Sequence, residues 1–314
     1  MVGRILVGID GSEGSRFALE WAAGDATARG AVIDAVTVCR GAGEDSAEGY
    51  FPYMVSHRMD VPAHVQADQA RQRLLGLVSE VAARFPKVVI EPHVYQGDPA
   101  EALCRRAQDA DALVVGARGH GTFAALLLGS VAAKCASHSP GPVVIVPAPA
   151  GGEPGRDRAP AGRIVVGVDT SEGSRHALRW AIEEARARNW AVQAVNVWGT
   201  SYGFDADFSW PANEKLEAHA KSRLSETIDE VAGAHPAVTI DPLVLEGDPA
   251  QKLFEVAGEA ELLVVGCRGH STVASLFLGS VATKCAYHSP RPVAIVHHHL
   301  AKQDPSDRPT PSGT

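Results

Sequence analysis

Two glycine-rich stretches of this sequence combine residue types that can bind an anion. GARGHGTFAALLLGS at 116–130 and GCRGHSTVASLFLGS at 266–280 place their glycines and a closing Gly-Ser pair at the same intervals. Glycine lacks a Cβ, so the backbone there can approach a ligand closely. Each Gly-Ser pair precedes a helical pattern, and we expect Ser130 and Ser280 to be the N-caps of those helices. Because helix N-termini favour anions, the spacing predicts a phosphate site in each stretch.

An aspartate ends the first apolar run of each half, in VGIDGS and again in VGVDTS. Asp10 and Asp169 can bind a sugar hydroxyl, a base amino group or a metal ion that is coordinated by phosphates. A plain Asx-turn that starts the next helix is the competing interpretation. The sequence leaves both interpretations open.

Basic residues accompany the glycine-rich stretches. Arg118 and Arg268 lie inside them, where a guanidinium can pair with phosphate or pack over a ribose, and a solvent-facing loop arginine is the alternative. Lys134 and Lys284 follow one helical turn after the serines, and we expect no direct role for them.

The glycine-rich stretches belong to a longer repeat that predicts the fold. GRILVGIDGSEGSRFALEWA at 3–22 matches GRIVVGVDTSEGSRHALRWA at 162–181. Short β-branched runs alternate with helical patterns, which indicates a parallel sheet covered on both faces. We expect α/β architecture with two tandem Rossmann-like, doubly wound domains, each a five-stranded parallel sheet whose ligands bind beyond the strands' carboxyl ends. In the first copy the expected strands are 5–9, 32–38, 88–95, 113–115 and 142–146.

Domain boundaries follow from the repeat and from composition. We expect a first domain at 1–147, a Pro- and Gly-rich linker at 148–161, a second domain at 162–299 and a disordered tail at 300–314. The final apolar runs, PVVIV and PVAIV, would be unprotected edges if each domain stood alone. We therefore expect the two halves to pair through these strands.

Composition narrows the classes of partner. The 314 residues include 29 Lys plus Arg against 37 Asp plus Glu, a net charge of −8, without a basic run, so we expect neither nucleic acid nor membrane as a partner. Without a leader pattern or a long apolar window, we expect a cytoplasmic chain. The five cysteines form no CxxC pair and are expected as reduced core thiols. Strand alternation separates neighbouring side chains, so we expect no metal at His297 to His299, whose role stays open.

The spacing G-xx-G-(nine residues)-G-[ST], complete in both stretches, resembles the nucleotide motif of the ATP-binding universal stress proteins. The VGID and VGVD strand ends and the HSPGPVVIV and HSPRPVAIV endings extend the resemblance over nearly the whole chain, and its tandem form is similar to members from actinobacteria. The resemblance implies one ATP per domain, with Mg²⁺. In the first copy it assigns the nucleotide to Gly8, Ile9, Asp10, Val38, Gly116, Arg118, Gly119, His120, Gly121, Thr122, Gly129, Ser130 and Val131. In the second copy it assigns the nucleotide to Gly167, Val168, Asp169, Val197, Gly266, Arg268, Gly269, His270, Ser271, Thr272, Gly279, Ser280 and Val281. Ser271 departs from the glycine of the first copy, so the second site is expected to hold its nucleotide differently.

The resemblance also implies a function. It implies a nucleotide-dependent regulator of stress, hypoxia or dormancy, a homodimer through the final strands and an unidentified regulatory protein partner. The chain has no P-loop and no dinucleotide fingerprint, and neither loop histidine, His120 or His270, has a clear orienting acid and nucleophile, so we expect no catalytic residue. The alternatives are a slow ATP hydrolase or phosphotransferase, and a sensor of another adenine nucleotide such as cAMP.

Overall fold

The protein repeats one βα unit order twice along the chain. The computed structural model describes residues 2–39, 63–119, 128–148, 162–199, 213–233, 238–269 and 278–297. The first copy contains β1 (Arg4–Gly8), α1 (Glu13–Arg29), β2 (Val32–Cys39), α2 (Ala63–Arg84), β3 (Ile90–Gln96), α3 (Pro99–Arg106), η1 (Ala107–Asp109), β4 (Ala112–Gly116), α4 (Ser130–His138) and β5 (Val143–Val146). The second contains β6 (Arg163–Gly167), α5 (Glu172–Arg188), β7 (Ala191–Trp198), α6 (Asn213–Ala232), β8 (Ile240–Glu246), α7 (Pro249–Ala257), β9 (Leu262–Gly266), α8 (Ser280–His288) and β10 (Val293–Val296).

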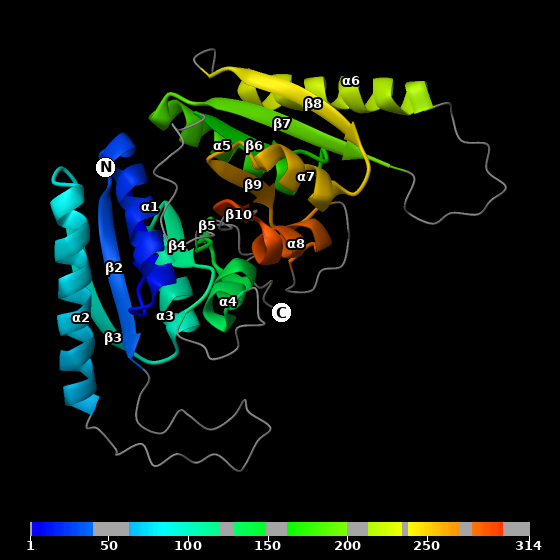
Figure 1. Cartoon of the computed structure of the whole chain (residues 1–314). Coiled ribbons are helices and arrows are strands. Elements are labelled where there is room, and N and C mark those ends of the chain that lie inside the picture. The colour runs from blue at the N-terminus through cyan, green and yellow to red at the C-terminus, as the bar shows by residue number, and fades with distance from the viewer. Residues whose placement is uncertain are drawn as a thin grey trace, which may run out of the picture.

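All ten strands form one sheet in the order β3-β2-β1-β4-β5-β10-β9-β6-β7-β8 (Figure 1). Within each half every neighbouring pair is parallel, which confirms the two doubly wound domains expected from the repeat. The expected strands are present with shifted ends. The largest shift is at β3, which begins at Ile90 rather than at Val88.

Helices cover both faces of the sheet, as the apolar strands require. Under α1, α2, α5 and α6 lies a first core that includes Leu19, Leu74, Leu178 and Leu224. Under α3, α4, α7 and α8 lies a second core that includes Leu103, Cys135, Leu253 and Cys285. Residues of the central strands alternate between the two cores, so these strands are apolar on both faces, whereas the edge strands β3 and β8 also carry polar residues such as Glu91 and Asp241.

The final strands join the two copies. β5 and β10 pair antiparallel, with Val144 opposite Ala294, which confirms the expected pairing of the two halves within the chain. Each of these strands also has a parallel neighbour, β4 for β5 and β9 for β10. Both edges of both strands are therefore occupied, so the expectation that a homodimer forms through the final strands is not met in this arrangement. A homodimer would need another surface.

Two buried carboxylates and two partly buried arginines form ion pairs between α1 and α5, at the boundary between the two copies. Arg29 donates to Asp25 at 2.7 Å and Arg188 donates to Glu184 at 2.7 Å, each within its own helix. Arg188 lies 3.1 Å from Asp25, and Arg29 pairs with Glu184. Asp25 and Glu184 are 1% and 0% exposed, so charge pairing across the joint is what makes their burial tolerable.

Aromatic rings enclose one of these charges. The guanidinium of Arg188 lies 4.9 Å from the ring centroid of Trp21 and 4.6 Å from that of Trp190. Trp21 and its counterpart Trp180 both pack against the first core. Burial lowers the pKa of Arg188, while the charge of Asp25 opposes that effect.

The end of β10 also contacts the first copy. The ring nitrogens of His297 lie 2.9 Å from the carbonyl oxygen of Ala136 and 3.1 Å from that of Gly141. Carbonyl oxygens only accept, so both contacts become hydrogen bonds only when the ring carries two N–H groups. His297 thus faces copy one at the C-terminal end of α4; the other two histidines lie outside the described residues.

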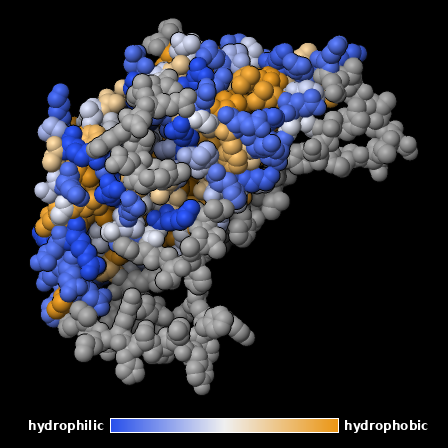
Figure 2. Space-filling view, viewed as in Figure 1, coloured by the Kyte–Doolittle hydropathy of each residue, from blue (hydrophilic) through white to orange (hydrophobic). Residues whose placement is uncertain are grey.

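The sheet is less completely covered at its β8 edge. α7 packs on β6, β7 and β9, and Figure 2 shows apolar residues gathered over β8 and α7. The half-buried apolar residues of these elements include Leu243, Leu245 and Phe254. None of the helices that the structure describes is long and apolar enough to span a bilayer. Residues 149–161 of the expected linker and the expected tail at 300–314 lie outside the described residues.

Candidate functional site

In each copy the functional residues expected from the sequence gather where the strand order reverses. β1 lies between β2 and β4, so the loops that leave β1 and β4 diverge to opposite faces of the sheet. Asp10 lies two residues beyond the end of β1, and the first glycine-rich stretch begins at the last residue of β4. In the second copy, β6 and β9 place Asp169 and the second stretch in the same way.

A turn fixes the carboxylate of Asp10. Oδ1 accepts from the Ser12 backbone N–H at 2.9 Å and from the Ser12 hydroxyl at 2.5 Å, and Ser12 in turn caps α1 through the Ser15 N–H at 3.2 Å. In the second copy Asp169 accepts from Ser171 at 3.0 and 2.5 Å. The Asx-turn interpretation is therefore confirmed, and the turn directs the other carboxylate oxygen toward the glycine-rich stretch.

Gly119 and Gly269 lie directly against these carboxylates. A Cβ at Gly119 would overlap Oδ2 of Asp10, and a Cβ at Gly269 would overlap Oδ2 of Asp169. Because glycine has no side chain, the backbone of each glycine-rich stretch can lie in direct contact with the aspartate carboxylate. Gly129 lies next to Gly119, since a Cβ built on Gly129 would be 3.7 Å from the Gly119 nitrogen. Asp10, Gly119 and Gly129 are therefore neighbours in the folded chain.

Gly116 is glycine because another backbone segment packs directly against it. A Cβ at Gly116 would lie 2.6 Å from the carbonyl carbon of Gly14, and at Gly266 it would lie 2.7 Å from that of Gly173. A Cβ on Gly14 would likewise overlap the carbonyl oxygen of Arg118. The first turn of α1 therefore packs backbone to backbone on the end of β4. Sequence reasoning missed Gly14 and Gly173, although the identical Glu-Gly-Ser-Arg in both copies was the available signal.

The helix that follows the stretch begins one residue earlier than expected. Gly129 and Gly279 are the N-caps of α4 and α8, and Ser130 and Ser280 are the first helical residues, so the expectation that the serines are the N-caps was wrong. The Gly129 N–H donates to the Ala117 carbonyl at 2.8 Å, which closes the neck of the loop. The N–H groups that follow Gly129 have no acceptor within the helix.

Gly129 itself leaves room in front of the helix. Its φ is −73°, which any residue can adopt, and a Cβ there would come no closer than 3.5 Å to the Ala117 carbonyl oxygen. At Gly279 the nearest atom of the described residues is the Cys267 carbonyl oxygen at 3.4 Å, and φ is −60°. The described residues thus leave space for a side chain at these two positions, so a bound ligand is a reason for glycine there in addition to the preference of an N-cap for glycine over alanine.

Other residues of the expected site contribute in different ways. Ile9 and Val168 are 5% and 2% exposed and face the first core. Val38 and Val197 are partly buried against the second core. Of the remaining expected residues, some are described and some are not.

Among the described ones, Gly8 and Gly167 end their strands, and Arg118 and Arg268 are exposed. Val131 and Val281 lie in the first turns of α4 and α8. Outside the described residues lie His120, Gly121, Thr122, His270, Ser271 and Thr272.

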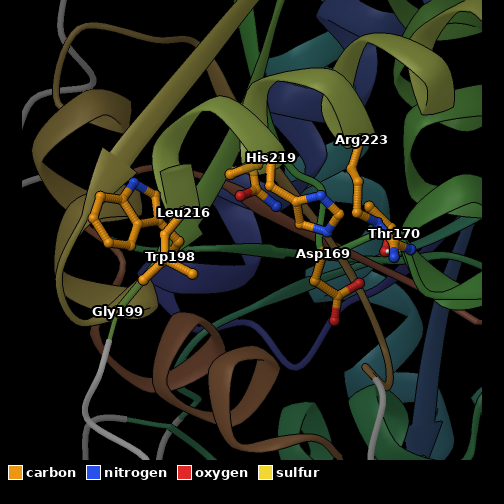
Figure 3. Close-up of a pocket in the computed structure, with 9 residues that line it drawn as sticks. Asp169, Thr170, Trp198, Gly199, Leu216, His219 and Arg223 are labelled. Carbon is orange, nitrogen blue, oxygen red and sulfur yellow. Dashed lines mark hydrogen bonds between the residues drawn. The ribbon is translucent and has the colours of Figure 1, made fainter. Parts of the chain in front are cut away.

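In the second copy a pocket of about 270 Å³ adjoins Asp169 on the α6 side (Figure 3). Trp198 ends β7, and Leu216, His219 and Arg223 reach the pocket from α6. These residues were missed in the sequence analysis because they lie on either side of a segment in which the copies diverge. The complete lining consists of Asp169, Thr170, Asn196, Trp198, Gly199, Leu216, His219, Ala220 and Arg223.

The backbone beside Asp169 differs from that beside Asp10. Thr170 has φ of 67°, a left-handed conformation that β-branched residues rarely adopt, where the first copy has Gly11 with φ of 85°. The Thr170 hydroxyl accepts from Arg223 at 2.9 Å, and its carbonyl oxygen accepts from Arg175. Two arginines therefore hold an unfavourable turn next to the candidate site of the second copy only.

A group of possible metal ligands lies elsewhere in the first copy. Asp34, Glu91 and His93 are close enough to share an ion, on β2 and β3. The Arg4 guanidinium already donates to Asp34 at 2.6 Å and to Glu91 at 3.1 Å. The group also has no equivalent in the second copy, where His93 is replaced by Leu243. We therefore assign no metal to it.

Comparisons with known proteins agree with this architecture. The model of the universal stress protein family matches residues 1–147 and 161–297. Universal stress protein Rv1996 of Mycobacterium tuberculosis is 30% identical over 312 residues, covering 96% of each chain. Universal stress protein Rv2623 of the same species is 30% identical over 310 residues, covering 94% of this chain and 97% of the relative. A universal stress protein from Archaeoglobus fulgidus shares the fold, with a TM-score of 0.66 at 21% identity, covering 94% of this chain and 98% of that chain. Two matched copies over most of the chain establish that it belongs to the universal stress protein family.

Proposed function

We propose that this chain binds ATP with Mg²⁺, one nucleotide per copy, and that occupancy changes its affinity for a regulatory protein partner. The partner, a further homodimer and a role in hypoxia or dormancy belong to the same proposal, as the resemblance to the tandem family members implies. Regulation of this kind requires that the nucleotide prefer one conformation of the chain.

The observation that carries the proposal is a constellation present in both copies. An anchored carboxylate, a glycine that only a bare backbone can occupy and the N-terminus of a helix lie next to one another, as Asp10, Gly119 and Gly129 show. A carboxylate oxygen suits ribose hydroxyls or a magnesium ion on the phosphates, and the helix N-terminus suits the phosphates themselves. Spacing and chemistry together fit a nucleoside polyphosphate.

The second copy offers a place for the base. The pocket beside Asp169 contains the indole of Trp198 and the imidazole of His219, and aromatic faces stack with bases. In the first copy the corresponding positions are Cys39 and Gln69, as the repeat aligns them. We therefore propose that the second site holds the base more tightly than the first.

The deciding experiment counts nucleotides. Freshly purified protein is denatured, and the released nucleotide is identified by mass spectrometry and quantified per chain; ATP at one molecule per copy is expected. Gly129→Ala and Gly279→Ala should each remove one of the two, because the new methyl group occupies the space in front of the helix without touching the chain closely. The loss in affinity at the altered site should be about 10-fold or more, or about 1.4 kcal/mol.

Gly24→Ala is the matched control, because Gly24 lies in α1 with open space around it. This variant should retain the full nucleotide content. Released cAMP or another adenine nucleotide would replace ATP in the proposal. Turnover of ATP with Mg²⁺ that is lost on substitution of both Asp10 and Asp169 would favour the hydrolase alternative. Protein that carries no nucleotide and binds none when it is added would overturn the proposal.

A further inference from the structure

Two cysteines of the first copy lie on helices that pack together. The side chains of Cys104 in α3 and Cys135 in α4 are hydrogen-bonded to each other, where the two helices meet on the second core. Cys135 is fully buried and Cys104 is half-buried. The pair thus combines a partly exposed cysteine with a fully buried one.

The hydrogen bond makes the two thiols chemically unequal. Donation from Cys135 lowers the pKa of the Cys104 thiol, although burial and the nearby Asp98 oppose this. The same bond, together with burial, raises the pKa of Cys135. Since the thiolate is the nucleophilic form of cysteine, Cys104 is the member of the pair that reacts first.

The other three cysteines have different surroundings. Burial raises the pKa of the Cys39 and Cys267 thiols and raises that of Cys285 to about 12. Cys285 is the counterpart of Cys135 in the second copy, but Phe254 stands there in the position of Cys104. The second copy therefore provides a natural comparison in which the buried cysteine has no reactive neighbour on α7.

We propose that Cys104 and Cys135 form a reversible disulfide when the protein meets a hydroperoxide. The Cys104 sulfur attacks the terminal peroxide oxygen, the O–O bond breaks, and an alcohol or water leaves, which converts Cys104 to a sulfenic acid. The Cys135 sulfur then attacks the Cys104 sulfur, and the sulfenic hydroxyl leaves with the Cys135 proton as water. The hydroperoxide gains the two electrons that the thiols lose. The bond would tie α3 to α4, and the proposal does not depend on the nucleotide.

The test uses the reduced full-length protein. It is treated with hydrogen peroxide, free thiols are blocked by alkylation, and the protein is digested with trypsin and analysed by mass spectrometry. Free thiols should fall from five to three per chain, and a disulfide should link peptides 88–105 and 135–156. Dithiothreitol should restore all five thiols.

Variants separate this pair from general oxidation. Cys104→Ser, at a half-buried position, should abolish the thiol loss, whereas Cys39→Ser should leave the loss of two thiols unchanged. Cys135→Ala should leave Cys104 to accumulate as sulfenic or sulfinic acid. If Cys135→Ala does not fold, trapping the Cys104 sulfenic acid with dimedone in the unaltered protein provides the same information. Oxidation of Cys39 before Cys104, or of Cys104 without a bond to Cys135, would overturn the proposal.

Discussion

Arg188 of α5 lies 3.1 Å from Asp25 of α1, across the boundary between the two copies. Each belongs to an acid–arginine pair four residues apart in its own helix, and the two pairs occupy equivalent places in the repeat. The two helices thus present the same charge pattern to each other. Association through such a pattern is self-complementary, like the interface of a twofold dimer.

Removal of one of these charges should be costly. Asp25→Ala leaves Arg188 buried without its partner across the joint, and the free energy of unfolding should fall by about 3–5 kcal/mol. Urea denaturation measures this change. Arg105→Ala is the control, since its pair with Glu101 is about 70% exposed on both sides and should be worth less than about 1 kcal/mol. Equal effects of the two variants would contradict the importance of the buried cluster.

Glycines in the glycine-rich stretch should divide into two kinds. Gly116→Ala forces a methyl group onto the Gly14 backbone and should lower the free energy of unfolding by at least about 2 kcal/mol. Gly129→Ala should lower it by about 1 kcal/mol or less, the usual cost of alanine at an N-cap, because its Cβ meets only ordinary contacts among the described residues. Thermal unfolding without nucleotide measures both. The distinction fails if Gly129→Ala is as destabilising as Gly116→Ala.

Asp248, the N-cap of α7, should contribute to stability in a pH-dependent way. Lys284 donates to it at 2.9 Å, and with the Gln251 backbone N–H it holds the pKa of this carboxyl below its ordinary value. A lowered folded pKa means that the contribution is present above the unfolded pKa of about 3.9 and is lost as pH falls through the folded pKa. Asp248→Asn should therefore lower the melting temperature near pH 6 but leave it nearly unchanged near pH 2.

The exposed position of Asp248 keeps the expected effect small, below about 1 kcal/mol. Lys284→Met should reproduce the pH dependence of the effect, because it removes the main cause of the lowered pKa. A loss of stability that is the same at pH 6 and at pH 2 would show that the carboxylate charge is not involved.

Trp198 should report on the second site alone. Trp198→Ala should weaken nucleotide binding in the second copy by about 1–3 kcal/mol if the base stacks on the indole, and should leave the first copy unaffected. Isothermal titration with Gly129→Ala as background isolates the second site. Unaltered affinity in that background would remove Trp198 from the proposed base pocket, without bearing on the phosphate end of the site.

The sequence predicted most of the architecture because its signals are local and repeated. Alternating apolar strands and helices predicted both five-stranded halves of the sheet, and the Asp-Gly-Ser turn predicted the anchored carboxylate of Asp10. The different roles of the glycines were not predictable from the sequence. Gly116 is required by a packed backbone and Gly129 leaves space in front of a helix, but both are simply glycine in the sequence.

The pocket beside Asp169 was not predictable for a different reason. Trp198 and His219 come from elements that are joined by the segment in which the two copies diverge, so the repeat provided no register for them. Their proximity arises only when α6 packs on β7. A tertiary contact of this kind leaves no periodic signal in a single sequence.

The antiparallel pairing of β5 with β10 reverses the direction of every strand from one half to the other. The carboxyl ends of the two sets of strands therefore face opposite edges of the sheet, and no ligand can touch both candidate sites. Fusion also removes the requirement for identical subunits. A symmetric dimer must accept each mutation twice, whereas a fused chain can specialise one half, as Thr170 for glycine and Trp198 for cysteine illustrate. The β5–β10 pairing thus allows the two candidate sites to diverge within one continuous sheet.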